Sequence, residues 1–565
     1  MTDQTNGERQ ATLSSITVSK RGAWLQVLAA LIWIPQAAII GFAVQNMLDG
    51  TPLSRWWTWL LLFVALGLMR GFLDTWGQRL CFKQARASLS VLRDTSLRAL
   101  LHRSPLDKNR PASGQAASLL TEQAESILPY LSKFQPIRLR VMVVPLAIAC
   151  AVLSQAWIAA LILLVAAPLI PVFMALVGQR TKRAAEEQMV EMGDMNAFLL
   201  DRLRGLGTLR AMSAIPYTAN QFLDRADRLR QRIMAVLKIA FLSSAVLEFF
   251  ASLGVAMVAV YVGFHLLGEV PYGAWGGKLT LGQGLFVLML APAFFEPLRE
   301  LSTAWHDRAS GQAALTGLQD MSRSGLPLQG DPLASPQPPL PRASPPAIAL
   351  QQIRFSYQDN TPLLWDQLDL SIQAGEKVAL FGPSGSGKST LLALLAGLIQ
   401  PLSGTVRVDG EPLQGAHADQ IRRRSAWLAQ QPHIFHGSLT DNIGLGRSHD
   451  EAALNRALLQ ARLDAVHALH GDQLLAEGGQ GISGGEKLRL ALARAWLDPS
   501  KDLILVDEPT AHLDTGTAQD LTEQLLRFAQ GRTVIVATHD THLARKMDRI
   551  ILMSDLLSPS QQEQA

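Results

Sequence analysis

The chain has 565 residues, which is too long for one ordinary domain. Hydrophobic residues make up 48% of it and charged residues only 17%, which excludes a protein that is soluble throughout its length. The net charge of +4 is small, and the two cysteines, Cys81 and Cys150, are too few for a disulfide framework.

Residues 1–23 are mostly polar and are predicted to form a cytoplasmic N-terminal segment. Lys20 and Arg21 lie directly before the first apolar run, but no small-residue cleavage site follows at the right distance. The pattern therefore favours an uncleaved first membrane span over a signal peptide.

Six apolar stretches are long enough, or nearly so, for a helix that crosses a bilayer, which needs about 20 residues. They lie near Trp24–Met47, Trp57–Trp76, Val141–Gln155, Ile158–Val177, Ala240–Leu267 and Leu281–Leu301. The two long loops, residues 77–140 and 178–239, are rich in Arg and Lys, and the short loops are nearly free of both. The positive-inside rule then predicts a multi-pass membrane domain over residues 24–320, with both termini in the cytoplasm. This topology explains the basic loops without any nucleic-acid partner.

Charged side chains inside apolar spans are costly, so each requires an explanation. Arg70, Glu248, Glu296 and Arg299 are the candidates. Pairing between such charges would fix the register of the helices, whereas unpaired charges would line a substrate cavity, and the sequence leaves both interpretations open. Trp305 and His306 follow the last span, and His306 is either a structural or solvated histidine or a ligand.

Residues 321–346 are predicted to be a linker. The stretch from Gly325 to Pro346, GLPLQGDPLASPQPPLPRASPP, is proline-rich and weakly hydrophobic, which is typical of a semi-extended spacer. It separates the membrane part from residues 347–565, whose composition is typical of a soluble α/β domain.

A phosphate-binding loop lies in this second part. The stretch LFGPSGSGKSTLLALLAGL, which starts at Leu380, matches G-x-x-x-x-G-K-[ST] between an apolar strand and a helix. Its glycines let backbone N–H groups approach phosphates, Lys388 reaches the β- and γ-phosphates, and Ser389 offers its hydroxyl to Mg²⁺. The predicted ATP contacts in this loop are Gly382, Pro383, Ser384, Gly385, Ser386, Gly387, Lys388, Ser389 and Thr390.

A second strand, DLILVDEP, ends in two carboxylates. We expect Asp507 to bind Mg²⁺ through water and Glu508 to polarise the attacking water. The sequence thus predicts an all-α membrane domain of six spans, followed by an α/β P-loop domain that hydrolyses ATP.

Upstream of Asp507, the stretch GGQGISGGEKLRLALARA resembles the L-S-G-G-Q signature of ATP-binding cassette (ABC) proteins. Ser483, Gly484, Gly485 and Glu486 stand at the S-G-G-Q positions. Two departures are mild: Ile482 replaces leucine, and glutamate replaces the final glutamine. The resemblance covers about residues 347–555.

This resemblance implies further roles. Tyr357 would stack on adenine, Gln430 would touch Mg²⁺ and couple to the membrane domain, Asp514 would belong to the D-loop, and His539 would be the switch histidine near the γ-phosphate. Because ABC proteins bind each ATP between the P-loop of one cassette and the signature of another, this chain resembles half of an exporter-type ABC transporter.

The membrane half resembles the CydD-type subunits of bacterial CydDC exporters, most strongly from Ile158 to Ala309. Stretches such as FLLDRLRGLGTLRAM and LAPAFFEPLRELSTAWHDRA carry this resemblance. It implies a heterodimer with a CydC-like subunit in the bacterial inner membrane, which exports cysteine and glutathione or handles haem in support of cytochrome bd assembly. A homodimeric lipid or multidrug exporter is the alternative.

The two cargo classes need different residues. Glutathione needs cations for its two carboxylates, which Arg70 and Arg299 would supply. Haem needs an axial ligand and basic groups for its propionates, which His306, beside Trp305 and near Arg308, would supply. Residue spacing does not decide between them.

Overall fold

The computed structural model describes residues 19–50, 56–107, 109–111, 113–275, 277–322, 325–331, 333, 344–357, 362–447, 449–470, 473–475, 481–511 and 513–556. Within these ranges some side chains are not described, chiefly those of residues 170–186 and of His306. The chain forms two compact units. The first contains residues up to Ser96 together with Ala112–Met321, and the second contains Leu97–Pro111 and the residues from Ser322 onward.

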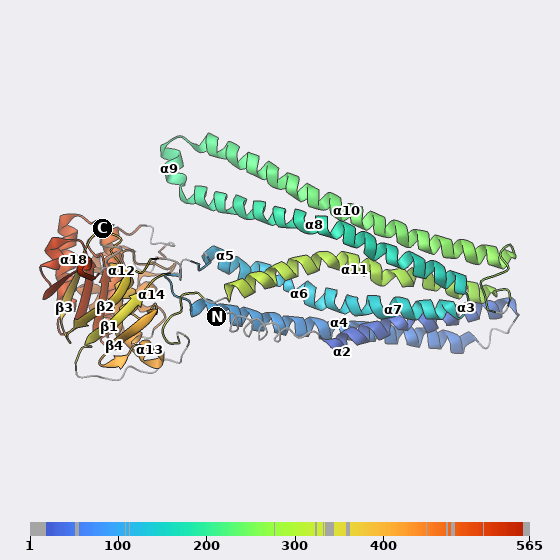
Figure 1. Ribbon diagram of the computed structural model, residues 1–565, viewed down its shortest axis with the longest axis horizontal. Helices are drawn as coiled ribbons and strands as arrows, with labels where there is room; N and C mark the ends of the chain where they lie inside the picture. Colours follow the sequence, from blue (N-terminus) through green and yellow to red (C-terminus); the bar gives the residue numbers. More distant parts are fainter. Residues whose placement is uncertain are drawn as a thin grey trace. The chain divides into compact units, whose positions relative to one another are not determined.

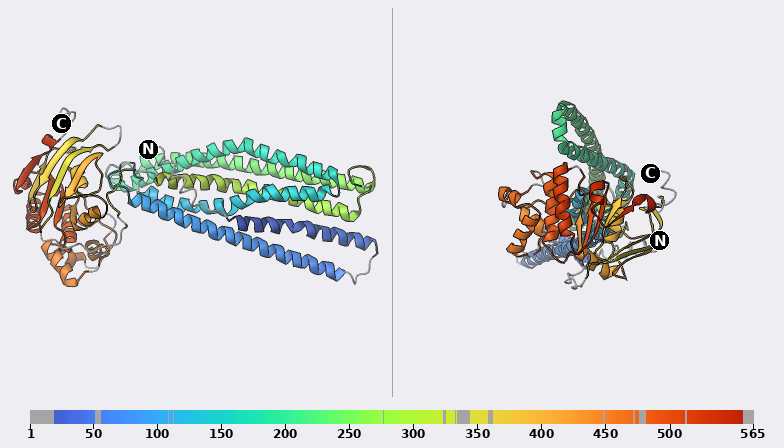
Figure 2. Two further views of the ribbon diagram at one scale, coloured as in Figure 1. Left: turned by 60° about the horizontal axis from the view of Figure 1, so that its bottom comes forward. Right: turned by 90° about the vertical axis from the view of Figure 1, so that its left-hand side faces the viewer.

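Long helices make up the first unit (Figure 1). They are α2 (Lys20–Leu31), α3 (Trp33–Leu48), α4 (Trp56–Leu101), α7 (Gln135–Leu153), α8 (Trp157–Arg204), α10 (Ile215–Leu267) and α11 (Leu281–Met321). Shorter helical segments join them, namely α5 (Ser113–Ser118), α6 (Ile127–Pro129), α9 (Leu206–Ala211) and the π-helical turns η2 (Leu119–Gln123) and η3 (Tyr130–Phe134). The helices α8 and α10 lie side by side, and α9 connects them at one end (Figures 1 and 2).

Every predicted span coincides with a helix. Five helical segments of the described residues are long and apolar enough to cross a membrane, judged by length and composition. They are Lys20–Leu48, Trp57–Leu101, Ile127–Leu153, Ala245–Leu267 and Leu281–Met321. The fourth predicted span lies in α8, where the described apolar part is Trp157–Leu169 and the side chains that follow are not described. Large apolar side chains such as Leu68 and Phe72 of α4 are exposed, which suits a helix in lipid.

Two helix pairs approach each other closely at glycines. A Cβ on Gly41 of α3 would lie 2.5 Å from the carbonyl oxygen of Gly282 on α11. Likewise, a Cβ on Gly22 of α2 would lie 2.8 Å from the carbonyl oxygen of Gly77 on α4. Both distances are too short for a real contact, so only glycine allows these backbones to pack so closely.

We expect Gly41→Ala to lower the apparent unfolding temperature of the detergent-solubilised protein, because the added methyl group forces α3 and α11 apart. Overpacking of this kind costs about 1–3 kcal/mol. Gly263→Ala on α10 is the matched control, since a Cβ at Gly263 meets nothing within 4 Å and alanine is the better helix former. Equal unfolding temperatures for the two variants would contradict this expectation.

Two sheets form the framework of the second unit. The parallel sheet has the strand order β6-β7-β8-β3-β9, and the antiparallel sheet has the order β2-β1-β4-β5. The strands are β1 (Ile348–Phe355), β2 (Trp365–Ile372), β3 (Lys377–Phe381), β4 (Ser403–Val408), β5 (Glu411–Pro412), β6 (Ser425–Leu428), β7 (Leu503–Asp507), β8 (Thr533–Thr538) and β9 (Arg549–Leu552). Every residue of β8 is buried, as expected for a central strand of a parallel sheet.

Helices cover both faces of the parallel sheet. The helices are α12 (Lys388–Leu395), α13 (Gly415–Arg424), α14 (Leu439–Gly444), α15 (Glu451–Gln460), α16 (Asp464–His470), α17 (Gly484–Trp496), α18 (Thr515–Phe528), α19 (Thr541–Ala544) and the 3₁₀ turn η4 (Met553–Leu556). Alternate residues of β7 enter different cores: Leu503 and Leu505 pack with α12, whereas Ile504 and Val506 pack with α17 and α18. This alternation places α12 and the pair α17–α18 on opposite faces.

A segment of the first long loop packs with the second unit. The N–H of Ser104 donates to the carbonyl of Leu326, and the N–H of Leu328 donates to the carbonyl of His102, both at 2.9 Å. Leu106 packs against the core that contains α12. The segment Leu97–Pro111 thus lies within the residue range predicted for the membrane domain, yet it belongs to the second compact unit.

Candidate functional site

The parallel sheet gathers the predicted catalytic residues at one edge. The strands of a parallel sheet all end at the same edge, where ligands bind in α/β folds. The residues are Gln430 after β6, Asp507 and Glu508 at the end of β7, His539 after β8 and Lys388 after β3. Since β6, β7, β8 and β3 are consecutive neighbours in the sheet, residues distant in sequence meet here.

The glycine-rich loop after β3 has a backbone conformation that suits a phosphate group. Gly385 and Gly387 have φ angles of 87° and 90°, in the left-handed region that favours glycine. A Cβ at Gly385 would meet nothing within 4 Å, so the backbone there is open to a ligand. Helix α12 begins at Lys388, directly after Gly387, and its first N–H groups add their dipoles to the loop.

The Lys388 side chain is buried between this loop and Glu508. Its ammonium group donates to the carbonyl oxygens of Gly382 at 2.8 Å and Pro383 at 2.9 Å, and it lies 3.1 Å from a Glu508 carboxylate oxygen. An ammonium group has three donors, so these three partners use all of them. To donate to an ATP phosphate, Lys388 must give up its interaction with at least one of these three partners.

Asp507 provides the acidic group for a metal ion. It is partly buried, and this burial raises the pKa of its carboxyl, although a hydrogen bond from Ser389 acts in the opposite direction. Its Oδ1 atom is buried and has no hydrogen-bond partner among the described residues. A carboxylate, a serine hydroxyl and phosphate oxygens are ligands that Mg²⁺ prefers, so these residues fit the metal that accompanies ATP.

Glu508 is held in a strained conformation beside His539. Its φ angle of 49° is unusual for a residue with a long side chain, and its N–H donates to the carbonyl of Ala537 at 2.9 Å. One carboxylate oxygen faces Lys388, and the other is hydrogen-bonded to Nδ1 of His539. The Glu508 side chain is 12% exposed and that of His539 is 63% exposed, so the pair lies at the surface of the site.

Tyr357 and Gln430 lie at two other places around the loop. The Tyr357 hydroxyl is 2.6 Å from the hydroxyl of Thr390 on α12, and its ring packs edge-on against Phe355 at 5.2 Å. Tyr357 is therefore fixed next to the phosphate-binding loop. Gln430 is exposed two residues after β6 ends, which leaves its side chain available to a ligand.

The signature residues begin helix α17, away from the elements that carry the phosphate-binding loop. Ser483 and Glu486 form a capping box: the Ser483 hydroxyl accepts from the Glu486 N–H at 3.3 Å, and the Glu486 carboxylate accepts from the Ser483 N–H at 2.7 Å. Glutamate and glutamine both complete this box, which explains why glutamate is tolerated there. Asp514 caps α18 by accepting from the Thr517 N–H at 2.9 Å, which lowers the pKa of its carboxyl.

The cluster at the strand ends has the groups that ATP hydrolysis requires. The Glu508 carboxylate can accept a proton from water, and one of its oxygens lies 3.1 Å from the Lys388 ammonium group. Bound Mg²⁺ would supply positive charge to the phosphate oxygens. Asp507 and Ser389 would hold the metal ion, and the hydrogen bond between His539 and Glu508 would keep the Glu508 carboxylate in place.

In the membrane unit, the structure brings Arg70 and Arg299 into one pocket. The pocket has a volume of about 470 Å³ and is lined by Ala30, Trp33, Arg70, Arg140, Met289, Pro292, Ala293, Glu296, Pro297 and Arg299. Arg299 pairs with Glu248 of α10 at 2.9 Å, so the structure contains the helix-pairing interaction that the sequence left open. Sequence analysis missed Arg140, because it lies just before an apolar run and pairs with Glu300 only through the fold, at 2.8 Å.

Trp305 lines a different pocket, also in the membrane unit. Its ring packs edge-on against Phe134 at 6.0 Å, and the guanidinium carbon of Arg308 lies 4.7 Å from the centre of the Trp305 ring. The side chain of His306 lies outside the described part of the structure. The prediction that His306 binds haem therefore stays a prediction.

Both parts of the chain match families of known proteins. The model of the ABC transporter transmembrane region matches residues 22–298, and the ABC transporter model matches residues 365–511. A bacterial Atm1-family ABC exporter with ATP bound has the same fold, with a TM-score of 0.74 and 21% sequence identity over 94% of this chain and 92% of that one.

Curated relatives match over nearly the whole chain. The transport ATP-binding protein AarD of Providencia stuartii is 34% identical over 94% of this chain and 90% of its own length. The glutathione/L-cysteine transport system ATP-binding/permease protein CydD of Haemophilus influenzae is also 34% identical, over 86% of this chain and 83% of its own length.

Proposed function

Because this chain belongs to the ABC transporter family, as an exporter of the CydD/CydC type that couples ATP hydrolysis to transport, we propose that it exports glutathione and L-cysteine. It acts as one half of a heterodimer with a CydC-like chain in the bacterial inner membrane. Two ATP molecules lie between the two cassettes, each held by the P-loop of one chain and the signature of the other. This arrangement is consistent with the placement of P-loop and signature on different elements of the cassette.

The observation that carries the cargo proposal is the arginine pocket of the membrane unit. Glutathione has two carboxylates and one ammonium group, and the pocket offers Arg70, Arg140 and Arg299 together with Glu296. Its volume of about 470 Å³ is within the range of small-molecule sites. The Nε atoms of Arg140 and Arg299 are buried and have no hydrogen-bond partner among the described residues, while the terminal nitrogens of these arginines pair with Glu300 and Glu248.

Arg70 is the guanidinium that is most available to cargo. Its guanidinium carbon lies 5.3 Å from the centre of the Trp33 ring, which orients it, and no carboxylate of the described residues pairs with it. We expect Arg70→Gln to raise the glutathione concentration for half-maximal transport into inside-out vesicles by about tenfold, because a charge-assisted hydrogen bond contributes about 1.5–3 kcal/mol. Arg79→Gln, an exposed position on the same helix, is the control.

Cargo identity is tested with the same vesicles and the purified complex. Stimulation of ATP hydrolysis by glutathione and cysteine, weakened by Arg70→Gln, would support the proposal. Stimulation of ATP hydrolysis by haem alone would favour Trp305 and His306 as cargo-binding residues and would overturn the proposal of a thiol cargo. A chain that forms a stable, active dimer without a CydC-like partner would favour the homodimeric lipid or drug exporter instead.

A further inference from the structure

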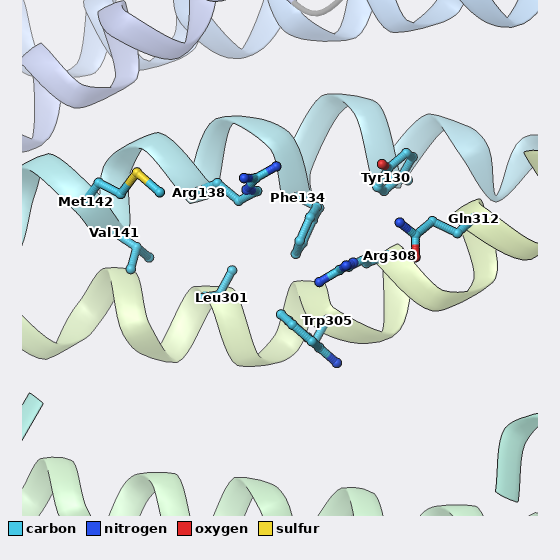
Figure 3. Close-up of a pocket in the computed structure, with 9 residues that line it drawn as sticks. All are labelled: Tyr130, Phe134, Arg138, Val141, Met142, Leu301, Trp305, Arg308 and Gln312. Carbon is cyan, nitrogen blue, oxygen red and sulfur yellow. The ribbon is translucent and has the colours of Figure 1, made fainter. Parts of the chain in front are cut away.

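A second pocket of the membrane unit lies between η3–α7 and α11 (Figure 3). It has a volume of about 290 Å³ and shares no lining residue with the arginine pocket described above. It is lined by Tyr130, Phe134, Arg138, Val141, Met142, Leu301, Trp305, Arg308 and Gln312. The close approach of η3 to α11 depends on Gly311, where a Cβ would lie only 3.0 Å from the Ser126 carbonyl oxygen and closer still to the Tyr130 side chain.

The two arginines of this pocket have free donors. Arg308 lies against two aromatic faces, with its guanidinium carbon 5.5 Å from the centre of the Phe134 ring and 4.7 Å from that of Trp305. Stacking of this kind orients the guanidinium and leaves its N–H groups available at the edge. Both Arg308 and Arg138 line this pocket, and neither has a carboxylate or carbonyl partner within the described ranges of the chain.

The pocket is apolar at one end and polar at the other. Met142, Val141 and Leu301 line one end, and Arg308, Gln312 and Tyr130 lie toward the other (Figure 3). The Tyr130 hydroxyl already accepts a hydrogen bond from Gln135 at 3.1 Å, so its proton is free to be donated. The apolar run of α7 begins at Val141, and the last apolar run of α11 ends near Leu301, so the pocket lies where both helices leave the hydrocarbon.

We propose that this pocket binds the headgroup of an anionic phospholipid. Because α11 leads into the cassette, which uses cytosolic ATP, the lipid comes from the cytoplasmic leaflet. The phosphodiester lies between Arg138 and Arg308, the headgroup hydroxyls meet Gln312 and Tyr130, and the first part of an acyl chain lies along Met142 and Leu301. Aromatic and arginine side chains at the depth of the headgroups, in a basic pocket between helices, are suited to this ligand class.

Free phosphate shares the charge of such a headgroup but cannot use the apolar end of the pocket. The test therefore compares the two ligands. The full complex is reconstituted in nanodiscs of phosphatidylcholine with and without phosphatidylglycerol, and lipid that stays bound after detergent extraction is measured by native mass spectrometry. The Arg138→Gln/Arg308→Gln variant is compared with wild type and with Arg79→Gln, an exposed arginine just beyond the apolar run of α4.

We expect retained phosphatidylglycerol in the wild type and in Arg79→Gln, and an affinity about tenfold lower for each pocket arginine removed. Excess inorganic phosphate should not displace the lipid. Arg308→Lys keeps the positive charge but loses the planar guanidinium, so it should bind phosphatidylglycerol with intermediate affinity. If the double variant has a lowered unfolding temperature, Arg308→Lys replaces it in the comparison. Equal lipid retention in all variants, or displacement by inorganic phosphate alone, would overturn the proposal. Loss of glutathione transport in Arg70→Gln would not affect it, because that residue lines the other pocket.

Discussion

Glu508→Gln is expected to lower the ATP turnover of the purified transporter by about 10²–10⁴-fold while ATP remains bound. The carboxylate is the group placed to accept the proton of the attacking water, and general-base catalysis of this kind contributes about that factor. Glutamine is isosteric but cannot accept the proton. It also removes the anion that faces Lys388 at 3.1 Å, which frees the lysine for the phosphates. The measurement is the steady-state ATPase rate, together with retention of labelled ATP through gel filtration.

The control for this variant is Glu523→Gln on α18, because Glu523 is exposed and lies outside the strand-end cluster. We expect its turnover to equal that of the wild type. Normal turnover in Glu508→Gln would show that the proton acceptor is another group, and loss of bound ATP would show that the carboxylate matters for binding rather than for hydrolysis.

Lys388→Ala is expected to weaken ATP binding by about 100-fold or more. Two charge-assisted hydrogen bonds to phosphate oxygens are worth about 1.5–3 kcal/mol each, and alanine removes both. The lysine is only 5% exposed, so no other cation can take its place without a change in the loop. The dissociation constant is measured with a fluorescent ATP analogue on the full complex.

Lys546→Ala provides the matched control, since Lys546 is an exposed lysine that follows α19 in the same domain. The unfolding temperature of both variants is measured as well, because Lys388→Ala also leaves the Glu508 carboxylate without its cation. Unchanged nucleotide affinity in a folded Lys388→Ala protein would be incompatible with the role assigned to this residue.

The sequence predicted for a physical reason that the motif residues lie together at one edge of the parallel sheet. Each motif follows a short apolar strand, and strands of one parallel sheet end at the same edge, so motif order alone indicates that Lys388, Asp507 and His539 meet. What the sequence did not predict are the partners within that edge. The left-handed φ of Glu508 and its hydrogen bond to His539 depend on how β7 and β8 lie in register.

In the membrane unit the sequence identified the charges but not their partners. Glu248 and Arg299 are 51 residues apart, and their pairing depends on the rotation of α10 against α11, which apolar helix patterns specify poorly. Arg140 drew no attention as a cargo residue because it lies at the end of an apolar run, where charges are common. No pattern in the sequence predicts that Leu97–Pro111 packs with the cassette. This packing depends on backbone hydrogen bonds, such as the one from the Ser104 N–H to the Leu326 carbonyl, which any side chain allows.

The length of α10 turns small rotations into large displacements. Of its 53 residues, those from 215 to 239 precede the predicted apolar span and extend about 38 Å as a helix. A tilt of about 5° about the start of this span would move the far end, where α9 is attached, by about 3 Å. The paired helices α8 and α10 therefore convert a displacement of about this size at α9 into a change in the tilt of their apolar parts.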